Sequence, residues 1–584
     1  MLKTLLSHVK EYRKASLITP LCMILEVACE MVIPLLMASI VDKGINVEGG
    51  NMPHILLTGA AMIGVALLGL LFGLGGAKYG AKASTGFARN LRKAMYENIQ
   101  TFSFSNIDKF STSGLITRLT TDVTNIQNAY QMILRMCMRC PISLICAMVL
   151  SFTINAKLAS IYLAATVFLG CILFLIVFIA MKYFSQAFPK YDELNESVQE
   201  NVSAIRVVKA YVREDYENKK FKKASGNIYK IFKKAESVVA WNNPVMTLTV
   251  NCTLLLVSWF GAHMVVTNEL STGQLMSLLS YCMNILMSMM MLSMFFVMIS
   301  MSLASMKRVV EVLDEKADIT NPENPVTEVA DGSIRFDHVS FAYNKDADRP
   351  VLRDINLEIK PGETIGILGG TGSAKSSLVN LISRLYDVTD GALYVGGVDV
   401  REYDIETLRN QVSVVLQNNV LFSGSILDNL RWGNKNATEE ECRRACELAC
   451  ADEFIQKMPE GYQTHIEQGG TNVSGGQKQR LCIARALMKQ PKILILDDST
   501  SAVDTATDAK IRKAFREAIP GTTKLIIAQR VSSLMHSDRI IVMENGVIDG
   551  IGTHEELLAK NEIYRDVYES QQSGSGDFDE KGGM

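Results

Sequence analysis

A glycine-rich stretch, GGTGSAKSS, has the residue types of a loop that binds phosphate groups. In such a loop, backbone N–H groups of a tight turn at a helix N-terminus surround the phosphates. Lys375 would reach the outer phosphates, and Ser376 would place its hydroxyl on Mg²⁺. The residues expected to contact a nucleotide here are Gly369, Gly370, Thr371, Gly372, Ser373, Ala374, Lys375, Ser376 and Ser377.

This loop departs from the usual pattern, G-x-x-x-x-G-K-[ST], at one position. The second fixed glycine of the pattern is Ala374 in this chain. Its methyl group stands where backbone must approach phosphate closely, so it is either tolerated or loosens nucleotide binding. A loop of this kind needs a buried strand before it and a helix after it. The apolar runs Thr364–Leu368 and Leu378–Leu385 are predicted to supply them.

A second string, VSGGQKQR at Val473–Arg480, follows about 100 residues later. A lone phosphate-loop pattern arises by chance in long chains, but its pairing with VSGGQ makes coincidence very hard to sustain. Together the two strings resemble the nucleotide-binding domain of ATP-binding cassette (ABC) transporters. In that family the N-terminus of the signature helix, here Ser474, Gly475 and Gly476, donates N–H groups to a γ-phosphate.

The resemblance assigns roles to residues outside the loop as well. Tyr343, in FAYN, matches the aromatic residue that stacks on adenine. Gln417, in VVLQNNVLFSGS, matches the glutamine that touches Mg²⁺ and senses the transmembrane domain. Asp497, after the apolar run ILIL, matches the strand-end carboxylate that holds Mg²⁺ together with Ser376. Ser501–Asp504 matches the loop that crosses to a partner domain, and the implied cofactors are ATP and Mg²⁺.

Two further departures concern hydrolysis. The family's hydrolytic glutamate follows the strand aspartate directly, and Asp498 occupies that position here. Aspartate is one methylene shorter, so its carboxylate falls roughly 1–1.5 Å short of the attacking water, a misplacement that can lower a rate ~10²-fold. The family's histidine is replaced by Gln529, which can hydrogen-bond the γ-phosphate but cannot carry a positive charge. Together with Ala374, these changes predict a site that binds ATP and hydrolyses it poorly.

The intact signature bears on how the chain assembles. In the family two cassettes close head to tail, so each ATP lies between one chain's phosphate loop and the other chain's signature. Two copies of this chain would make two impaired sites. One copy paired with a chain that carries Glu and His would make one competent site. The resemblance therefore favours a heterodimer with a second, non-identical ABC half-transporter, in which this chain is the degenerate-site subunit.

The composition indicates a membrane protein. The 584 residues are 48% hydrophobic with a formal net charge of −2, which is too long and too apolar for one soluble domain. The near-zero net charge argues against nucleic acid as a partner. Six spans of ~20 residues or more are predicted to cross a lipid bilayer. They are residues 16–40, 55–80, 132–154, 157–182, 244–267 and 274–304.

Lysine and arginine are unevenly distributed among the segments that connect the spans. The N-terminal stretch and the long connections after the second and fourth spans are basic, whereas the other connections are short and poor in basic residues. Basic connections stay on the cytoplasmic side. Both termini and the two long connections are therefore predicted to be cytoplasmic, in a multi-pass protein of the cell membrane. No cleavable signal peptide is evident before the first span.

The long basic connections keep helical periodicity and resemble the cytoplasmic helix extensions of ABC exporters. Asn106–Val123 resembles the first coupling segment of that family, and Val198–Glu214 resembles the second. Their tips, near Ser105–Phe110 and Tyr211–Tyr216, are expected to press on nucleotide-binding domains. A solvated helical hairpin is the plainer alternative, but position and resemblance favour coupling. The fold class implied is a type IV exporter: an α-helical membrane domain with six transmembrane helices, followed by an α/β P-loop ATPase domain with a helical subdomain. The predicted divisions are a transmembrane domain at 1–313, a linker at 314–332, a nucleotide-binding domain at 333–570 and a disordered tail at 571–584.

A row of methionines in the sixth span is a candidate contact for cargo. Methionine suits surfaces that re-pack around varied apolar shapes. Ordinary helix packing explains any single one of them better, and for the whole row the two explanations are about equal. The spacing places on one helical face Met283, Met287, Met290, Met294 and Met298.

Two carboxylates inside the first span, Glu26 and Glu30, share one face at i and i+4. Charged groups within a span are expensive and usually face a cavity or a partner. They could attract cationic cargo, or they could pair with Arg135 and Arg139. The pairing is slightly favoured.

The favoured function is ATP-driven export of amphipathic or drug-like small molecules, as in bacterial multidrug exporters. One alternative keeps the fold and changes the cargo to lipid or peptide. The peptide version is weakened because no peptidase-like domain precedes the first span in this sequence. A second alternative is an ATP-gated channel or regulatory subunit, since degenerate sites also occur there. Such proteins tend to carry extra regulatory segments, and the sequence offers none beyond the short tail.

Overall fold

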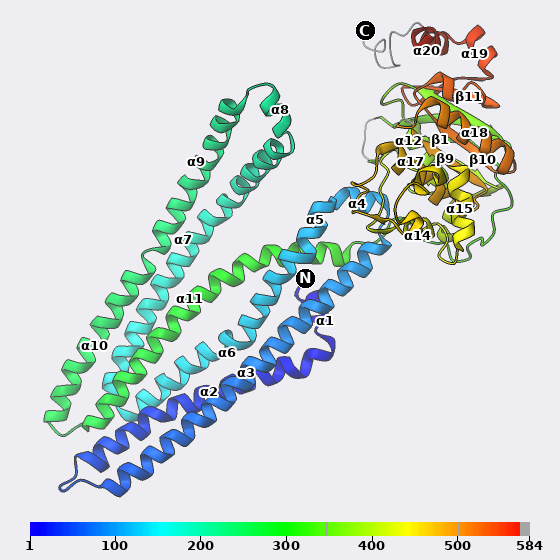
Figure 1. Cartoon of the computed structure of the whole chain (residues 1–584). Coiled ribbons are helices and arrows are strands. Elements are labelled where there is room, and N and C mark those ends of the chain that lie inside the picture. The colour runs from blue at the N-terminus through cyan, green and yellow to red at the C-terminus, as the bar shows by residue number, and fades with distance from the viewer. Residues whose placement is uncertain (345–348, 500–501, 573–584) are drawn as a thin grey trace. The chain divides into compact units, whose positions relative to one another are not determined.

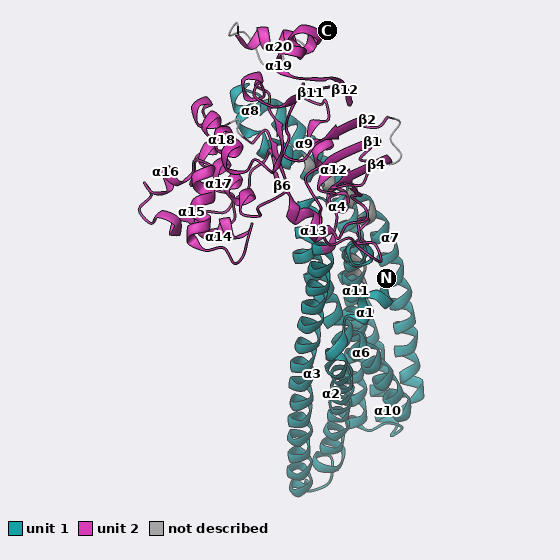
Figure 2. Cartoon of the chain, turned by 90° about the vertical axis from the view of Figure 1, so that its right-hand side faces the viewer, with its two compact units in different colours: residues 1–100, 111–315 teal, residues 101–110, 316–584 magenta. Residues whose placement is uncertain are grey.

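The computed structural model describes residues 1–344, 349–499 and 502–572. The chain divides into two compact units, which are coloured separately in Figure 2. Unit 1 comprises residues 1–100 and 111–315, and unit 2 comprises residues 101–110 and those from 316 onward. The main division therefore falls within the segment expected as the linker. Residues 101–110, which include the tip of the first expected coupling segment, group with unit 2 rather than with the membrane helices.

Unit 1 is built from long helices (Figure 1). Within the described residues, six helical segments are long and apolar enough to cross a membrane, which confirms the six predicted spans. Their bounds are Lys10–Ile45, Met52–Thr101, Thr112–Ile154, Ala156–Tyr183, Glu214–Val266 and Thr272–Leu292. The helices are α1 (Leu2–Ser7), α2 (Arg13–Ile40), α3 (Met52–Thr101), α5 (Thr112–Thr117), α6 (Val123–Ile154), α7 (Ala156–Ser203), α8 (Ile205–Ala210), α9 (Glu214–Val239), α10 (Asn242–Val266) and α11 (Thr272–Asp314).

Side-chain caps mark the start of three of these helices, α5, α7 and α11. The Asn155 side chain accepts a hydrogen bond from the Leu158 N–H at 3.1 Å, where α7 begins. Ser271 and Gln274 form a reciprocal capping box at the start of α11. Beyond the apolar spans, α7 and α9 run side by side with α8 at their tip (Figure 1). Tyr211, which follows α8 in the second expected coupling segment, is 75% exposed.

Unit 2 contains a six-stranded sheet in the order β12-β11-β3-β10-β9-β6. Its strands are parallel except for the β11–β12 pair, which is antiparallel. A four-stranded sheet, β2-β1-β4-β5, is antiparallel throughout. The strands are β1 (Ile334–Phe341), β2 (Leu352–Ile359), β3 (Thr364–Gly369), β4 (Asp390–Val395), β5 (Val398–Asp399), β6 (Val412–Val415), β9 (Ile493–Asp497), β10 (Thr523–Ile527), β11 (Arg539–Glu544) and β12 (Val547–Gly552), with a further short pair, β7 (Gly424–Ser425) and β8 (His465–Ile466).

Helices surround this sheet and complete the ATPase-type domain. The helices of unit 2 are α4 (Phe104–Phe110), α12 (Lys375–Ile382), α13 (Ile405–Gln411), α14 (Ile426–Arg431), α15 (Glu439–Leu448), α16 (Asp452–Ile455), α17 (Gly475–Leu487), α18 (Thr505–Ala518), α19 (His554–Lys560) and α20 (Glu562–Gln572). Of these, α14, α15, α16 and α17 pack on one another and correspond to the predicted helical subdomain.

The parallel sheet separates two hydrophobic cores. Along β9, Ile493 and Ile495 belong to the core shared with the antiparallel sheet, whereas Leu494 and Leu496 belong to the core shared with the helical subdomain. Successive side chains of a strand point to opposite faces. A strand covered on both faces is apolar without alternation, and this is why the run ILIL precedes Asp497.

The C-terminal boundary differs from the expectation. The segment 571–584 was predicted to be disordered, but α20 continues through Gln572, and Gln571 makes two side-chain hydrogen bonds. Composition placed this boundary two residues too early, because the helix is held by contacts that a count of Gly, Ser and charged residues does not register. Residues 573–584 lie outside the described part of the chain.

Candidate ATP-binding site

The phosphate loop lies between β3 and α12. The strand coincides with its predicted run to within one residue, whereas α12 begins and ends three residues earlier than the predicted run Leu378–Leu385, because the last residues of the loop form its first turn. Ala374 immediately precedes α12 and has left-handed backbone, with φ +71° and ψ 23°. Glycine adopts this conformation freely, whereas a residue with a Cβ is strained by roughly 1–2 kcal/mol. The Lys375 Nζ donates hydrogen bonds to the carbonyl oxygens of Gly369 and Gly370, both at 2.7 Å. The lysine therefore lies across the mouth of the loop, where outer phosphates would meet it.

Strand order explains how distant parts of the sequence reach one place. The phosphate loop follows β3, Gln529 follows β10 and Asp497 ends β9. These three strands are adjacent and parallel, so their carboxyl ends lie at one edge of the sheet, where α/β proteins bind ligands.

The resulting pocket has a volume of about 330 Å³. It brings together most of the predicted phosphate-loop residues, both carboxylates after β9 and both predicted glutamines. Its lining is Val351, Thr371, Gly372, Ala374, Lys375, Ser376, Ser377, Gln417, Asp497, Asp498, Ile527 and Gln529.

Two neighbouring carboxyl groups in this pocket, Asp497 and Asp498, have pKa values above their usual range. Asp497 is 5% exposed, and burial raises its pKa, against a hydrogen bond from Ser376 and the charge of Lys375. Burial also raises the pKa of Asp498, and the negative charge of Asp497 raises it further, while a hydrogen bond from Gln417 opposes both. Both carboxyl groups would gain from a cation held between them and a phosphate.

The residues present fit Mg²⁺. This ion prefers a few oxygen ligands from protein and takes the rest from phosphates and water. Asp497, Ser376 and Gln417 offer a carboxylate, a hydroxyl and an amide oxygen in one pocket. In the described part of the chain, no group of three or more His, Cys, Asp or Glu side chains could hold a metal by itself. When bound with nucleotide, Mg²⁺ would neutralise phosphate charge.

Tyr343 stands beside this pocket rather than in its lining. Its ring is half exposed, and its hydroxyl lies 2.9 Å from the Ser377 Oγ in α12. The ring meets Tyr386 edge to face, with centroids 5.0 Å apart. An exposed aromatic face next to the phosphate loop is available to stack on a base.

Tyr386 was not anticipated from the sequence. Its hydroxyl donates a hydrogen bond to Asp108 Oδ2 at 2.9 Å, and its ring lies 6.0 Å from that of Phe104. Burial and this hydrogen bond raise the pKa of Tyr386. Both partners belong to α4, in the first expected coupling segment. An unbroken series of contacts therefore runs from α4 through Tyr386 and Tyr343 to the helix that follows the phosphate loop.

The signature residues lie outside the pocket. Ser474 caps α17, and it forms a reciprocal capping box with Gln477. A Cβ on Gly476 would meet the Ala502 carbonyl oxygen at 2.8 Å, so glycine is required there for packing alone. Ser474, Gly475 and Gly476 do not line the phosphate-loop pocket of their own chain. Ser501 of the predicted crossing loop lies outside the described residues, and Ala502 donates its N–H to Gln479 Oε1 at 3.0 Å.

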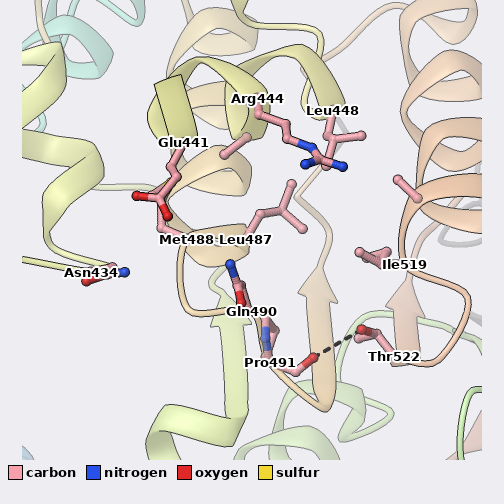
Figure 3. Close-up of a pocket in the computed structure, with 12 residues that line it drawn as sticks. Asn434, Glu441, Arg444, Leu448, Leu487, Met488, Gln490, Pro491, Ile519 and Thr522 are labelled. Atoms are coloured by element: carbon pink, nitrogen blue, oxygen red, sulfur yellow. Dashed lines mark hydrogen bonds between the residues drawn. The ribbon is translucent and has the colours of Figure 1, made fainter. Parts of the chain in front are cut away.

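A second pocket, of about 440 Å³, lies where α15 faces the ends of α17 and α18 (Figure 3). Figure 3 shows Arg444 and Leu448 above it and Gln490 and Pro491 below. None of the residues predicted for the ATP site lines this pocket.

The carboxylates of the first span form ion pairs. Arg139 donates to Glu26 Oε1 at 3.1 Å and to Glu30 Oε2 at 3.0 Å. The expected pairing with arginine is therefore observed for Arg139. Arg135 takes part in neither of these two ion pairs. Four of the methionines expected to contact cargo are between 39% and 62% exposed in the single chain. They are Met283, Met287, Met290 and Met294. Met298 is half-buried.

Fold and site together define a P-loop ATPase joined to a six-span membrane domain. The ABC transporter transmembrane region model matches residues 16–290, and the ABC transporter model matches residues 352–501. The uncharacterized ABC transporter ATP-binding protein YfiB of Bacillus subtilis is 37% identical over 571 residues, 98% of this chain and 99% of YfiB. The chain belongs to the ABC transporter family.

Two further relatives extend the comparison. The putative multidrug export ATP-binding/permease protein YgaD of Bacillus subtilis is 31% identical over 590 residues, 98% of this chain and 99% of YgaD. A solved structure of a bacterial Atm1-family ABC exporter with ATP bound superposes with a TM-score of 0.83 at 24% identity, over 96% of this chain and 99% of that one. The fold is therefore that of an ABC exporter half-transporter.

Proposed function

We propose that this chain is one subunit of a heterodimeric ABC exporter, that it binds ATP at a degenerate site of its own, and that it supplies its signature to the competent site of a non-identical partner. The observation that supports this most is the composition of the phosphate-loop pocket. Lys375, Ser376 and Asp497 have the chemistry to bind Mg-ATP, whereas Asp498 and Gln529 stand where hydrolysis needs Glu and His.

The geometry around Asp498 supports weak hydrolysis. Its side chain is one methylene shorter than that of glutamate, and its backbone lies in the left-handed region, with φ +46°. A carboxyl whose pKa is raised is a better proton acceptor, but only if it reaches the water. Gln529 offers a neutral amide, so charge that develops on the γ-phosphate is met by a hydrogen bond without a countercharge.

The signature at the start of α17 supports the proposal that it serves the ATP site of a second chain. The end of α17 keeps its serine cap and both glycines, and it lies apart from the pocket of its own chain. A helix N-terminus with free N–H groups favours an anion. A second chain that closes head to tail would bring its own ATP against this end.

The proposed cargo is an amphipathic, drug-like small molecule, moved outward across the cell membrane with both termini on the cytoplasmic side. The relative YgaD is named a putative multidrug export protein, and the exposed methionine row offers an adaptable apolar surface. Arg139 pairs with both Glu26 and Glu30, so one positive charge offsets one of the two negative charges and weakens the attraction that these carboxylates would exert on cationic cargo.

Transport by the assembled complex in inverted membrane vesicles tests the proposal. A fluorescent amphipathic dye is expected to accumulate with ATP and not with a non-hydrolysable analogue. ATPase activity that lipid stimulates and dye does not would replace drug-like cargo with lipid. An ATP-gated chloride-like current without dye uptake would replace export with a channel.

A further inference from the structure

We infer that Gln571, near the end of α20, is a positioning residue for Gln529 in the ATP site, and that the C-terminal helix thereby sets how well this site distinguishes ATP from ADP. The inference rests on the proposed role of Gln529 as the group that hydrogen-bonds the γ-phosphate.

One side chain bridges the backbone on both sides of Arg530. The Gln571 Nε2 donates to the Gln529 carbonyl oxygen at 2.8 Å, and the Gln571 Oε1 accepts from the Val531 N–H at 2.9 Å. A carbonyl needs a donor and an N–H needs an acceptor, so the two contacts fix which end of the amide is which. Beyond the end of β10, the Gln571 amide makes the backbone hydrogen bonds that a neighbouring strand would otherwise supply.

The packing of α20 delivers this side chain. Tyr564 and Val567 are 0% and 8% exposed, and they belong to the same core as Val531 and Leu534. Gln571 lies seven residues after Tyr564 and four after Val567, so the three share one face of the helix. The buried face therefore ends in an amide aimed at the loop. Gln572, on the next position, is exposed and donates instead to the Tyr568 hydroxyl within α20.

The far end of the same loop is held by α18. Asp508 Oδ2 accepts from the Ser533 hydroxyl at 3.1 Å, and Arg512 donates to the Ser533 carbonyl oxygen. The loop from 529 to 533 is thus fixed at both ends, by α18 at Ser533 and by α20 at Gln529. Gln529 lines the ATP pocket. Its backbone position sets where its side chain starts and therefore whether the side-chain amide can meet the γ-phosphate.

Nucleotide binding to the full chain, by displacement of a fluorescent ATP analogue, tests the inference. The measured quantity is the ratio of ADP to ATP dissociation constants. Gln529→Ala is expected to lower this ratio about tenfold, the value of a hydrogen bond to a charged group. Gln571→Ala is expected to lower it about threefold or more with ADP affinity unchanged, and Gln572→Ala is expected to leave it unchanged.

Two further measurements separate positioning from a structural role. Gln571→Glu keeps the size and the acceptor for Val531 but loses the donor for Gln529, so it should lower the ratio as Gln571→Ala does. If Gln571→Ala lowers the melting temperature, the ratio measured for Gln571→Glu is used in its place to test the positioning role. In the Gln529→Ala background, Gln571→Ala should have no further effect.

The failures are distinguishable. If Gln529→Ala leaves the ratio unchanged, the proposed role of Gln529 is wrong. If Gln529→Ala lowers the ratio and neither Gln571 variant does, the proposed site stands and the positioning inference is overturned. An additive effect of the two alanine substitutions would also overturn it.

Discussion

The chain has two helix N-termini that can meet phosphate, and they are built differently. At α12 the residue before the helix is Ala374, which has strained backbone and no side-chain cap. At α17 the corresponding residue is Ser474, which forms a complete capping box. The first end carries three departures from the family around it, and the second carries none. This difference fits the proposed function, in which the signature serves the ATP site of another chain and this chain's own site lacks the usual Glu and His.

The largest expected effect comes from the signature, tested in mixed dimers of two differently tagged copies. One copy carries Asp498→Glu with Gln529→His, and the other supplies an unchanged signature. Gly475→Gln in the second copy should abolish most of the hydrolysis, by about 10² or more, because backbone could no longer approach the γ-phosphate closely. A Cβ at Gly475 meets only Ala502 at 3.5 Å, an ordinary contact, so the variant should fold.

The matched control places Gly475→Gln in the first copy instead. It should reduce hydrolysis far less, because that signature serves the unrestored site. Lys375→Ala in the second copy should also reduce it less, since the affected site turns over slowly in any case. Equal losses would indicate strong coupling between the sites, and the reverse order would overturn the assignment in trans.

The next effect concerns the pocket itself. Asp498→Glu with Gln529→His should raise hydrolysis at this chain's own site by ~10², the scale of the proposed misplacement. ATPase in a complex whose partner glutamate is disabled measures this. If the double substitution leaves ATPase activity unchanged while the partner's signature is intact, Asp498 and Gln529 are not the cause of slow hydrolysis at this site.

A smaller effect is expected at the contact between Tyr386 and Asp108. Tyr386→Phe removes one hydrogen bond to a carboxylate and keeps the ring contacts, so cargo-stimulated ATPase should fall about threefold or more while basal ATPase changes little. Asp108→Asn should behave similarly. Tyr394→Phe, in β4, is a matched control outside this contact. Equal losses of basal and stimulated activity would argue against a role in coupling.

The smallest effect concerns Ala374. Ala374→Gly should relieve left-handed strain and raise the melting temperature of the nucleotide-binding part by about 2–4 °C, the shift that ~1 kcal/mol gives in a domain of this size. Differential scanning calorimetry of the full chain in detergent measures it. A lower melting temperature would mean that the greater freedom of glycine in the unfolded chain outweighs the strain.

Local strings predicted the phosphate loop, its flanking strand and helix, Asp497 and the signature, because each depends on neighbours in sequence. The six spans followed from apolar length alone. Tyr386 and Gln571 were missed because their partners, Asp108 and Gln529, lie far away in sequence, and no local pattern marks such contacts. The strain at Ala374 appeared only with its backbone angles. The end of α20 was misplaced because packing, rather than composition, sets it.

ATP turnover by the purified wild-type chain alone shows whether its own ATP site is degenerate. The chain should bind ATP, measured with a fluorescent analogue, and hydrolyse it well below about 1 s⁻¹, a low value for an enzyme. Turnover above that value by copies of this chain alone would contradict a degenerate site and the need for a different partner.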